Sequence, residues 1–384
     1  MVCRRLKDMT SFIVMDVLER AQEMERAGES VIHLEVGEPD FNTPEAIKES
    51  AIEALRRGDT HYTHSLGTPK LREAICAYYS KTYGVNNFEP DQVIVTSGTS
   101  PAFLVGMSTV LECGDEIILS NPHYSCHPNF VRFLEAVPKM VRVYEEDAFQ
   151  YRPEAIKAEL TPRTKAILIN SPANPTGNLL EPERMAEIAD LGRLVMSDEI
   201  YHGLVYEGRA RSILEFTDNC IVYNGFSKLY AMTGWRLGYL IVPKYMVRPI
   251  QKMVQNFFIS ANSVAQAAGC TALTDPSVRE DVQKMLETYD RRRRYIIPRL
   301  REIGFGITVE PTGAFYVLAN ARRFTDDSYK FAFEVLENAK VGITPGVDFG
   351  SNAEGYVRFS YANSLENIKE GLNRLENYLN GRGR

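Results

Sequence analysis

Seven short apolar runs alternate with helical patterns through the middle of this 384-residue chain. They lie at residues 92–96, 116–119, 140–144, 166–169, 193–196, 221–223 and 237–242. Continuous apolar runs between amphipathic segments are typical of strands that are buried on both faces of a sheet. The pattern therefore predicts an α/β fold with a mainly parallel, seven-stranded sheet that is flanked by helices.

The pattern changes after about residue 275. A long charged helix is expected over 276–303, and a closing helix from Leu365. Between them we expect short strands around 307–309, 315–319, 341–344 and 357–361. An opening helix over 11–27 ends at Gly28, as a helix C-terminus should. We therefore expect a large domain over 41–275 and a smaller α+β domain formed by 1–40 and 276–384.

The overall charge excludes some classes of partner. The net charge is −6 and the sequence pI is about 5.7, so there is no electrostatic reason to expect nucleic acid or an anionic membrane as a partner. The basic run 291–294 is expected to form a solvated helix face or a patch between subunits. No window approaches the length and apolarity of a membrane span.

The cysteines and the N-terminus indicate a cytoplasmic protein. Arg4 and Arg5 precede no uninterrupted apolar run, unlike a secretory signal. Six cysteines without paired short spacings fit buried thiols in a reducing compartment. His123, Cys126 and His127 form the one cluster that resembles metal ligands, but it lacks a second distant pair, so an ordinary pocket wall is favoured over a zinc site.

Polar motifs follow five of the apolar runs. They lie at residues 97–100, 121–124, 170–177, 197–201 and 224–228. The carboxyl ends of parallel strands meet at one edge of a sheet, and ligands bind there. The sequence therefore predicts a pocket that is built from these five loops.

Lys228 is the residue with the most specific chemistry in these loops. It lies in the segment 224–238, NGFSKLYAMTGWRLG, among small residues. A buried amine can form an imine with an aldehyde, while the Ser227 hydroxyl and the Arg236 guanidinium can bind a phosphate of the same molecule. Pyridoxal 5′-phosphate carries both groups. The alternative is a solvated surface lysine, which is the commoner use of this residue.

Further motifs occur in a fixed order along nearly the whole chain. They are VGEPD at 36–40, Tyr62 with Gly67 and the pair 71–72, the segments 170–177, 197–201 and 225–238, GAFY at 313–316, and VRFS at 357–360. Together they resemble the fold type I, class I aminotransferases that use pyridoxal phosphate. The resemblance is strongest to the branch that contains the prokaryotic aspartate and aromatic aminotransferases.

The resemblance implies roles around the cofactor ring. Lys228 would be the covalent link and the proton shuttle between the substrate Cα and the cofactor C4′, and Asp198 would pair with the pyridine nitrogen. Tyr201 and Asn174 would share the phenolic oxygen, and Tyr124 would stack on the ring. Taken alone, Asp198 could be a helix N-cap, Asn174 a turn residue and Tyr124 a core residue.

The resemblance also implies a phosphate site and a second subunit. The residues that match the phosphate ligands are Gly98, Thr99, Ser100, Ser227 and Arg236. Gly98, Thr99 and Ser100 open a helix after a strand, where a plain N-cap would use the same geometry. Tyr62 matches a tyrosine that reaches the phosphate in the neighbouring subunit, so we expect a homodimer.

The substrate α-carboxylate is expected to bind Arg358, with Gly37 and Asn174 beside it. An arginine can clamp a carboxylate with two parallel hydrogen bonds, and a glycine lets its backbone N–H approach closely. On a strand with alternating apolar neighbours, Arg358 could otherwise face solvent.

The side chain of the substrate is less well defined. Some aspartate enzymes of this branch have a lysine just after the phosphate-loop glycine, where this chain has Ser100 and Pro101. A preference for aspartate is therefore not indicated. The plausible pocket members suit aromatic, aliphatic or alanine-like substrates, and they are Phe12, Ile13, Met15, His64 and His123.

The function that these residues imply is transfer of an α-amino group from an amino acid to a 2-oxo acid by a ping-pong cycle. A carbon–sulfur β-lyase on the same scaffold is the first alternative. A non-catalytic pyridoxal phosphate sensor is a more distant alternative. In such regulators this fold is fused to a DNA-binding domain, and the acidic balance of the present chain argues against that function. The helix between Gly177 and Ser197 is expected to be about one turn shorter than is usual for the family.

Overall fold

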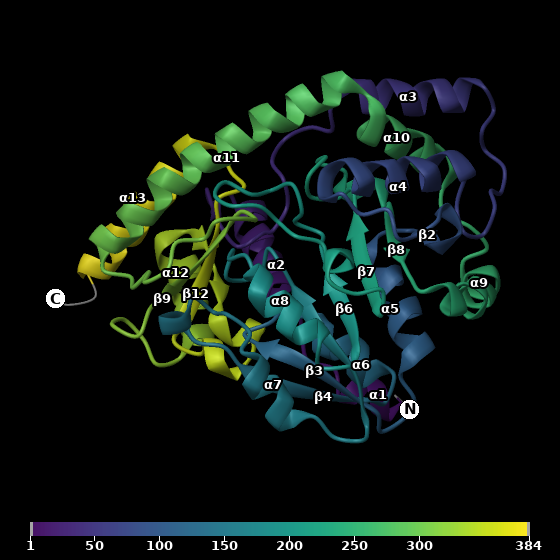
Figure 1. The fold of residues 1–384 in the computed structure, drawn as a ribbon. Helices are drawn as coiled ribbons and strands as arrows, with labels where there is room; N and C mark the ends of the chain where they lie inside the picture. Colours follow the sequence, from purple (N-terminus) through teal and green to yellow (C-terminus); the bar gives the residue numbers. More distant parts are fainter. Residues whose placement is uncertain (1–2, 382–384) are drawn as a thin grey trace.

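The computed structural model of the chain describes residues 3–381. Within them, one large sheet has seven strands. Across the sheet these are β2 (Val93–Thr96), β8 (Gly238–Ile241), β7 (Cys220–Gly225), β6 (Leu194–Asp198), β5 (Thr164–Asn170), β3 (Glu116–Asn121) and β4 (Val137–Arg142). Strands β6, β7 and β8 of this sheet are labelled side by side in Figure 1. Strands β7, β6, β5, β3 and β4 run parallel, and β8 is antiparallel to both of its neighbours. The predicted mainly parallel, seven-stranded sheet is confirmed.

Helices cover both faces of this sheet. One face packs against α5 (Thr99–Val110), α6 (His127–Phe133) and α9 (Lys244–Phe257). The other packs against α3 (Glu45–Arg56), α4 (Pro69–Tyr83), α7 (Pro153–Glu159), α8 (Pro182–Ala189) and α10 (Ser263–Thr274). Side chains alternate between the two cores along each strand, so that Ile117 and Leu119 face one core and Ile118 the other. This two-sided burial explains why the strands are apolar throughout.

A smaller α+β part packs beside the sheet. Its strands are β9 (Tyr316–Asn320), β11 (Thr344–Pro345) and β12 (Tyr356–Ser360) in one antiparallel sheet, and β1 (Ile32–His33) paired in parallel with β10 (Val341–Gly342). Its helices are α2 (Ile13–Arg26), α11 (Pro276–Ile303), α12 (Ser328–Ala339) and α13 (Leu365–Gly381), and a short α1 (Arg4–Lys7) contacts α6. The long helix α11 packs against α3 and α10 of the large sheet's helical layer and against α13 of the smaller part (Figure 1). The predicted domain boundaries themselves stay a prediction.

Three details of the predicted elements differ from the structure. The strand expected at 307–309 is wrong, because the Ile307 carbonyl accepts hydrogen bonds from the Arg301 guanidinium and the Thr308 N–H donates to the Glu145 carboxylate. These side-chain bonds take the place of a backbone ladder. The strand expected at 140–144 begins earlier, at Val137, and the run 341–344 is divided between β10 and β11.

The basic run at 291–294 was expected to form a solvated helix face or a patch between subunits, and the solvated face is wrong for two of its members. Arg292 and Arg293 are 6% and 2% exposed. Arg292 makes two hydrogen bonds to the Asp40 carboxylate, at 2.7 and 2.8 Å, and Arg293 bonds to Asp290 and to the Pro311 carbonyl. A paired guanidinium can be buried where an unpaired one cannot. Arg292 therefore ties α11 to the segment that carries Gly37.

The cysteines also depart in part from expectation. All six lie in the described residues and are free thiols there. Cys220 and Cys270 are buried, but Cys3 and Cys113 are exposed, so the expectation of buried thiols is wrong for these two. Cys3 precedes the first helix, and Cys113 lies in the turn between α5 and β3. No helix within residues 3–381 is long and apolar enough to cross a membrane.

Candidate active site

A cavity of about 340 Å³ lies where the carboxyl ends of β5, β6 and β7 meet β9, β12 and the N-terminal segment. Most of the site residues predicted from the sequence line it, namely Gly37, Thr99, Ser100, Tyr124, Asn174, Asp198, Tyr201, Ser227, Lys228, Arg236 and Arg358. The edge of a parallel sheet is where such a cavity is expected. The structure therefore brings these distant residues together as predicted.

Lys228 extends into this cavity from the loop that follows β7. Its Nζ donates a hydrogen bond of 2.7 Å to the Gly37 carbonyl oxygen. Burial lowers the pKa of the Lys228 amine from 10.5 to about 8, Glu38 opposes this shift, and the positive charges of Arg358 and Arg236 add to it. The expectation of a solvated lysine is excluded. An amine with this pKa is in part unprotonated near neutral pH and can act as a nucleophile or a base.

Asp198, the last residue of β6, is held by two neighbours. Its Oδ2 lies 3.1 Å from His127 Nε2, and its Oδ1 accepts a hydrogen bond from the Ile200 N–H. The residues that follow Asp198 form a turn and not a helix, so the N-cap interpretation is wrong. Both Asp198 and His127 are buried. The carboxylate is therefore fixed in orientation at the floor of the cavity.

The sequence did not identify His127 as a partner of Asp198. It noted His127 only within the metal-like cluster with His123 and Cys126. In the described residues, no group of three or more His, Cys, Asp and Glu side chains is placed to hold a metal ion. His127 contacts a carboxylate that lies 71 positions away in the sequence, and no local signal predicts that contact.

Arg358 lies on β12 at the opposite end of the cavity and is 3% exposed, so the solvent-facing alternative is wrong. Its Nη1 donates to the Asn174 side-chain oxygen at 2.9 Å, and its Nη2 donates to the Glu35 carbonyl at 2.5 Å. Its buried Nε has no hydrogen-bond partner within residues 3–381. A buried guanidinium with an unsatisfied N–H is poised to bind an anion.

The N-terminus of α5 lies beside a second guanidinium, that of Arg236. Gly98 precedes Thr99 with φ +98°, and a Cβ at Gly98 would lie 2.6 Å from Arg236 Nη2. Glycine therefore lets the guanidinium approach the positive end of the helix. The Thr99 hydroxyl is buried and unpaired in the described chain, and no side chain of this chain caps α5 there. The plain N-cap interpretation of Thr99 and Ser100 is thus not supported, and backbone N–H groups at a helix start with a nearby guanidinium are able to bind a phosphate.

Aromatic and apolar side chains form the wall of the cavity between these two ends. The Tyr124 ring lies edge-on to Phe12 and to His127, at 6.0 and 5.1 Å between ring centres. The other apolar members are Val14, Met15, Val36, Phe103, Phe130 and Ile200. Among the predicted pocket members, Phe12 and Met15 line the cavity, whereas Ile13 and His64 do not.

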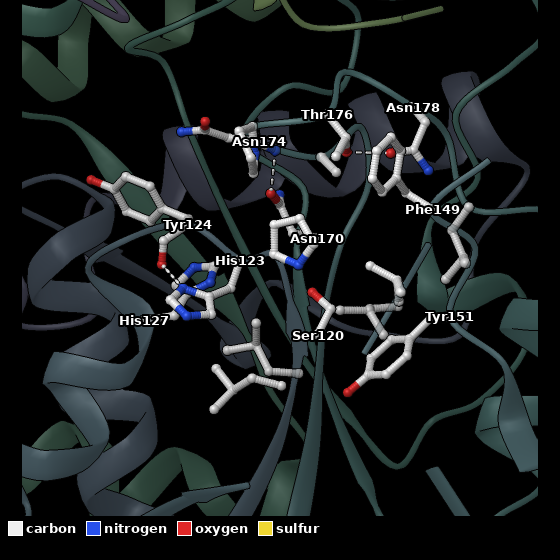
Figure 2. A pocket seen from close by; sticks show the side chains of 18 residues that line it. Ser120, His123, Tyr124, His127, Phe149, Tyr151, Asn170, Asn174, Thr176 and Asn178 are labelled. Carbon is white, nitrogen blue, oxygen red and sulfur yellow. Dashed lines mark hydrogen bonds between the residues drawn. The ribbon is translucent and has the colours of Figure 1, made fainter. Parts of the chain in front are cut away.

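His123 lines a separate cavity of about 40 Å³ behind this wall, which Figure 2 shows. Tyr124, Asn170 and Asn174 line both cavities. His123 Nδ1 lies 3.1 Å from the Tyr124 carbonyl oxygen, and burial lowers the His123 pKa to about 4, so the ring is neutral near pH 7. Asn170 Oδ1 accepts a hydrogen bond from the Asn174 N–H at 2.8 Å, as the dashed line in Figure 2 marks. Asn174 is therefore held in place from this side.

Two predicted site residues, Gly98 and Tyr62, do not line the cavity of the described chain, and one residue without a predicted role, Tyr316, does. Tyr62 is 81% exposed and lies outside the cavity of its own described chain, so its role stays a prediction that depends on a second subunit. Tyr316 lines the cavity but was not assigned a role, although it belongs to the GAFY motif. The cationic side chains among the described residues that line the cavity are Lys228, Arg236 and Arg358.

One cavity at the carboxyl edge of a doubly covered sheet thus contains an amine of lowered pKa, a helix N-terminus and a guanidinium, which together suit a phosphorylated aldehyde cofactor. Residues 29–375 match the model of a family described as aminotransferase class I and II. The chain therefore belongs to this pyridoxal phosphate-dependent family, and it is a transaminase.

Individual relatives match this chain over nearly its full length. A (5-formylfuran-3-yl)methyl phosphate transaminase of Methanocaldococcus jannaschii is 43% identical, over 99% of this chain and 100% of the relative. An aspartate aminotransferase of Pyrococcus horikoshii is 38% identical, over 96% and 94%. The solved Thermus thermophilus aspartate aminotransferase with maleate is 36% identical, has a TM-score of 0.94 and covers 98% of this chain and 99% of that one. Its similarity confirms the fold type I architecture.

The lowered pKa of Lys228 makes a prediction about stability in the cofactor-free protein. Because the folded pKa of about 8 lies below the unfolded value of 10.5, the unfolded state binds more protons between these values, and stability rises with pH there. Lys228→Met removes this dependence. The variant should gain stability relative to the wild type at pH 7, and this difference should shrink by about 2 to 3 kcal/mol between pH 7 and pH 10.

Urea denaturation of both proteins at each pH measures this difference. Lys252→Met, at an exposed lysine of α9, controls for the loss of a lysine charge. An equal difference between Lys228→Met and the wild type at both pH values would show that the amine titrates as an ordinary lysine.

Proposed function

We propose that Lys228 carries pyridoxal phosphate and moves the proton during amino transfer in a ping-pong cycle. The observation that carries this proposal is the position of the Lys228 amine, which lies in one cavity with the N-terminus of α5 and with the Arg358 guanidinium. The lowered amine pKa supports both nucleophilic attachment and later base catalysis. Bound pyridoxal phosphate supplies an electron sink for the substrate Cα.

The residues of this chain fit that cofactor at each of its polar groups. The unpaired Thr99 hydroxyl and the close approach of Arg236 to Gly98 fit the phosphate, with Ser100 and Ser227 beside them. Asp198, oriented by His127, would hold a proton on the pyridine nitrogen. Tyr201 and Asn174 would donate to the phenolic oxygen, and Tyr124 would cover one face of the ring.

The substrate carboxylate would bind at the other end. Arg358 offers its unpaired Nε, Asn174 already contacts its Nη1, and Gly37 lies in the same cavity. Because the guanidinium is anchored through the Glu35 carbonyl, its plane is set before the substrate arrives. This orientation would place the substrate Cα near the Lys228 amine.

We propose donors with small or apolar side chains, such as alanine or aromatic amino acids. The three cations of the described cavity are all used, by the cofactor or by the α-carboxylate, so this chain leaves no positive charge for a second carboxylate. The wall of Phe12, Met15 and Val36 favours apolar groups by burial. Aspartate would have to bury an unpaired charge against this wall, which is costly.

A phosphorylated aromatic aldehyde is a second candidate acceptor, beside a 2-oxo acid. The Methanocaldococcus jannaschii relative is named for a furan aldehyde that carries a phosphate. A guanidinium fork binds a phosphate as well as a carboxylate, so Arg358 suits either group. The aromatic side chains Phe12 and Tyr124 would pack against a flat ring.

We also propose that the protein is a homodimer in the cytoplasm. A homodimer would bring Tyr62 to the neighbouring site, and large apolar side chains on the same chain, Leu55, Phe257 and Ile259 among them, are exposed as an interface would require. The free cysteines suit a reducing, cytoplasmic location. The relatives favour amino transfer over the carbon–sulfur β-lyase and over the non-catalytic sensor.

A panel of donors and acceptors tests the chemistry. Alanine, phenylalanine, leucine and aspartate are each paired with pyruvate, 2-oxoglutarate and (5-formylfuran-3-yl)methyl phosphate, and products are measured by mass spectrometry. The apolar donors should exceed aspartate in kcat/KM by about tenfold or more, because aspartate leaves a carboxylate unpaired. Lys228→Ala should lower turnover by about three orders of magnitude or more.

The panel, with an added incubation of cysteine without an acceptor, separates the proposed donor class and the role of the lysine from the lyase alternative. Aspartate as the best donor would contradict the proposed donor class, and undiminished turnover by Lys228→Ala would contradict the role of the lysine. Pyruvate and ammonia released from cysteine without any acceptor would favour the lyase.

Mixed dimers test the role of Tyr62. Tyr62→Ala should weaken cofactor binding by about tenfold, because one hydrogen bond to a phosphate is lost. If the tyrosine acts in the neighbouring subunit, a hybrid of one Tyr62→Ala chain and one Lys228→Ala chain contains one site with both native side chains. The hybrid should then show about half the wild-type activity per dimer. A hybrid that binds the cofactor no better than the Tyr62→Ala homodimer would place Tyr62 in its own subunit's site or outside the site.

A further inference from the structure

Tyr316, the first residue of β9, contacts three of the candidate site residues at once. Its hydroxyl lies 2.8 Å from the Tyr201 hydroxyl. Its ring lies against the Arg358 guanidinium, with 4.2 Å between the ring centre and Cζ. A Cβ at Gly37 would lie 2.0 Å from the Tyr316 hydroxyl, so the absence of a side chain at Gly37 makes room for it.

We propose that Tyr316 is a positioning residue that links the phenolic-oxygen end of the site to the carboxylate-binding end. This inference rests on the proposed roles of Tyr201 and Arg358. Tyr316 would act through these two residues, with its hydroxyl on the first and its ring on the second.

The hydroxyl fixes the direction of a hydrogen-bond chain. Burial raises the pKa of Tyr201 well above 10 and also raises the pKa of Tyr316, so both groups are neutral and each has one hydrogen to donate. If Tyr201 donates to the cofactor oxygen, it accepts from Tyr316. A hydroxyl that accepts one bond becomes a stronger donor in the next, so Tyr316 strengthens the bond from Tyr201 to the cofactor.

The ring fixes the plane of the arginine. Arg358 donates hydrogen bonds to Asn174, to the Glu35 carbonyl and to the Thr344 hydroxyl. The rings of Tyr316 and Phe349 lie against its guanidinium, with centres 4.2 and 4.8 Å from Cζ. Such stacking is attractive and restricts rotation of the guanidinium. The guanidinium plane, and with it the unpaired Nε, is thereby fixed before a carboxylate binds.

The two contacts can be separated by substitution. Tyr316→Phe removes the hydroxyl and keeps the ring, whereas Tyr316→Leu removes both. Tyr361→Phe is a matched control, because Tyr361 is also buried, donates its hydroxyl to the Ala314 carbonyl at 3.2 Å and is not a member of the cavity wall in the described chain. If Tyr316→Leu does not fold, Tyr316→Met replaces it.

Two measurements on the cofactor-loaded protein read these contacts without turnover. The first is the pH midpoint of the absorbance change of the bound cofactor. Tyr316→Phe should raise this midpoint by a few tenths of a unit to about one unit. A weaker bond from Tyr201 leaves more negative charge on the phenolic oxygen, and this charge favours the protonated nitrogen of the lysine link.

The second measurement is the dissociation constant of hydrocinnamate, a carboxylate with an apolar tail. Tyr316→Leu should raise it about five- to thirtyfold, and Tyr316→Phe should leave it near the wild-type value.

The outcomes separate this inference from the proposed function. A midpoint in Tyr316→Phe equal to that of the wild type and of Tyr361→Phe would overturn the hydroxyl link. Unchanged hydrocinnamate binding by Tyr316→Leu would overturn the ring contact. A wild-type protein without any cofactor absorbance would instead overturn the proposed function itself.

Discussion

The chemistry of this protein is confined to one edge of a sheet, because both faces of that sheet are buried under helices. Apolar side chains fill the two cores on either side of the strands, so polar groups can reach water and ligands only where the strands end. Asp198 closes β6 and Lys228 follows β7, while the loop after β5 presents Asn174. Burial of the Lys228 amine at this edge lowers its pKa, so that the amine can act as a base near neutral pH.

The smaller α+β part completes this edge and sets the second end of the site. It contributes Arg358 and Tyr316 from two paired strands, and Arg358 in turn donates to the Glu35 carbonyl beyond β1. The paired Arg292 and Asp40 tie α11 to the segment that carries Gly37, whose carbonyl accepts the bond from Lys228. The amine, the N-terminus of α5 and the guanidinium are thus held at fixed separations by elements that are distant in the sequence. Such preorganisation lowers the cost of orienting a substrate.

The sequence predicted what local patterns determine. The apolar runs predicted the strands of the sheet, and the motifs at the ends of these runs predicted most of the residues that line the cavity. The resemblance supplied the cofactor, which the family confirms. What the sequence missed depends on contacts between distant residues, such as His127 with Asp198 and Tyr316 with Tyr201, which are 71 and 115 positions apart. The burial of Arg292 and Arg293 was missed for the same reason. Asp40 and the Pro311 carbonyl, which accept hydrogen bonds from these two arginines, lie outside α11. Tyr62 depends on a second chain, and neither the sequence nor one subunit can place it.

Reduction of the cofactor-loaded protein with borohydride, followed by peptide mapping, tests the central claim most directly, because it fixes the cofactor to the nitrogen that holds it. We expect a single pyridoxyl-modified peptide that contains Lys228, because this amine shares the cavity with the N-terminus of α5 and its lowered pKa favours attack on an aldehyde near neutral pH. Modification at another lysine, or a loaded protein without a modified peptide, would contradict it.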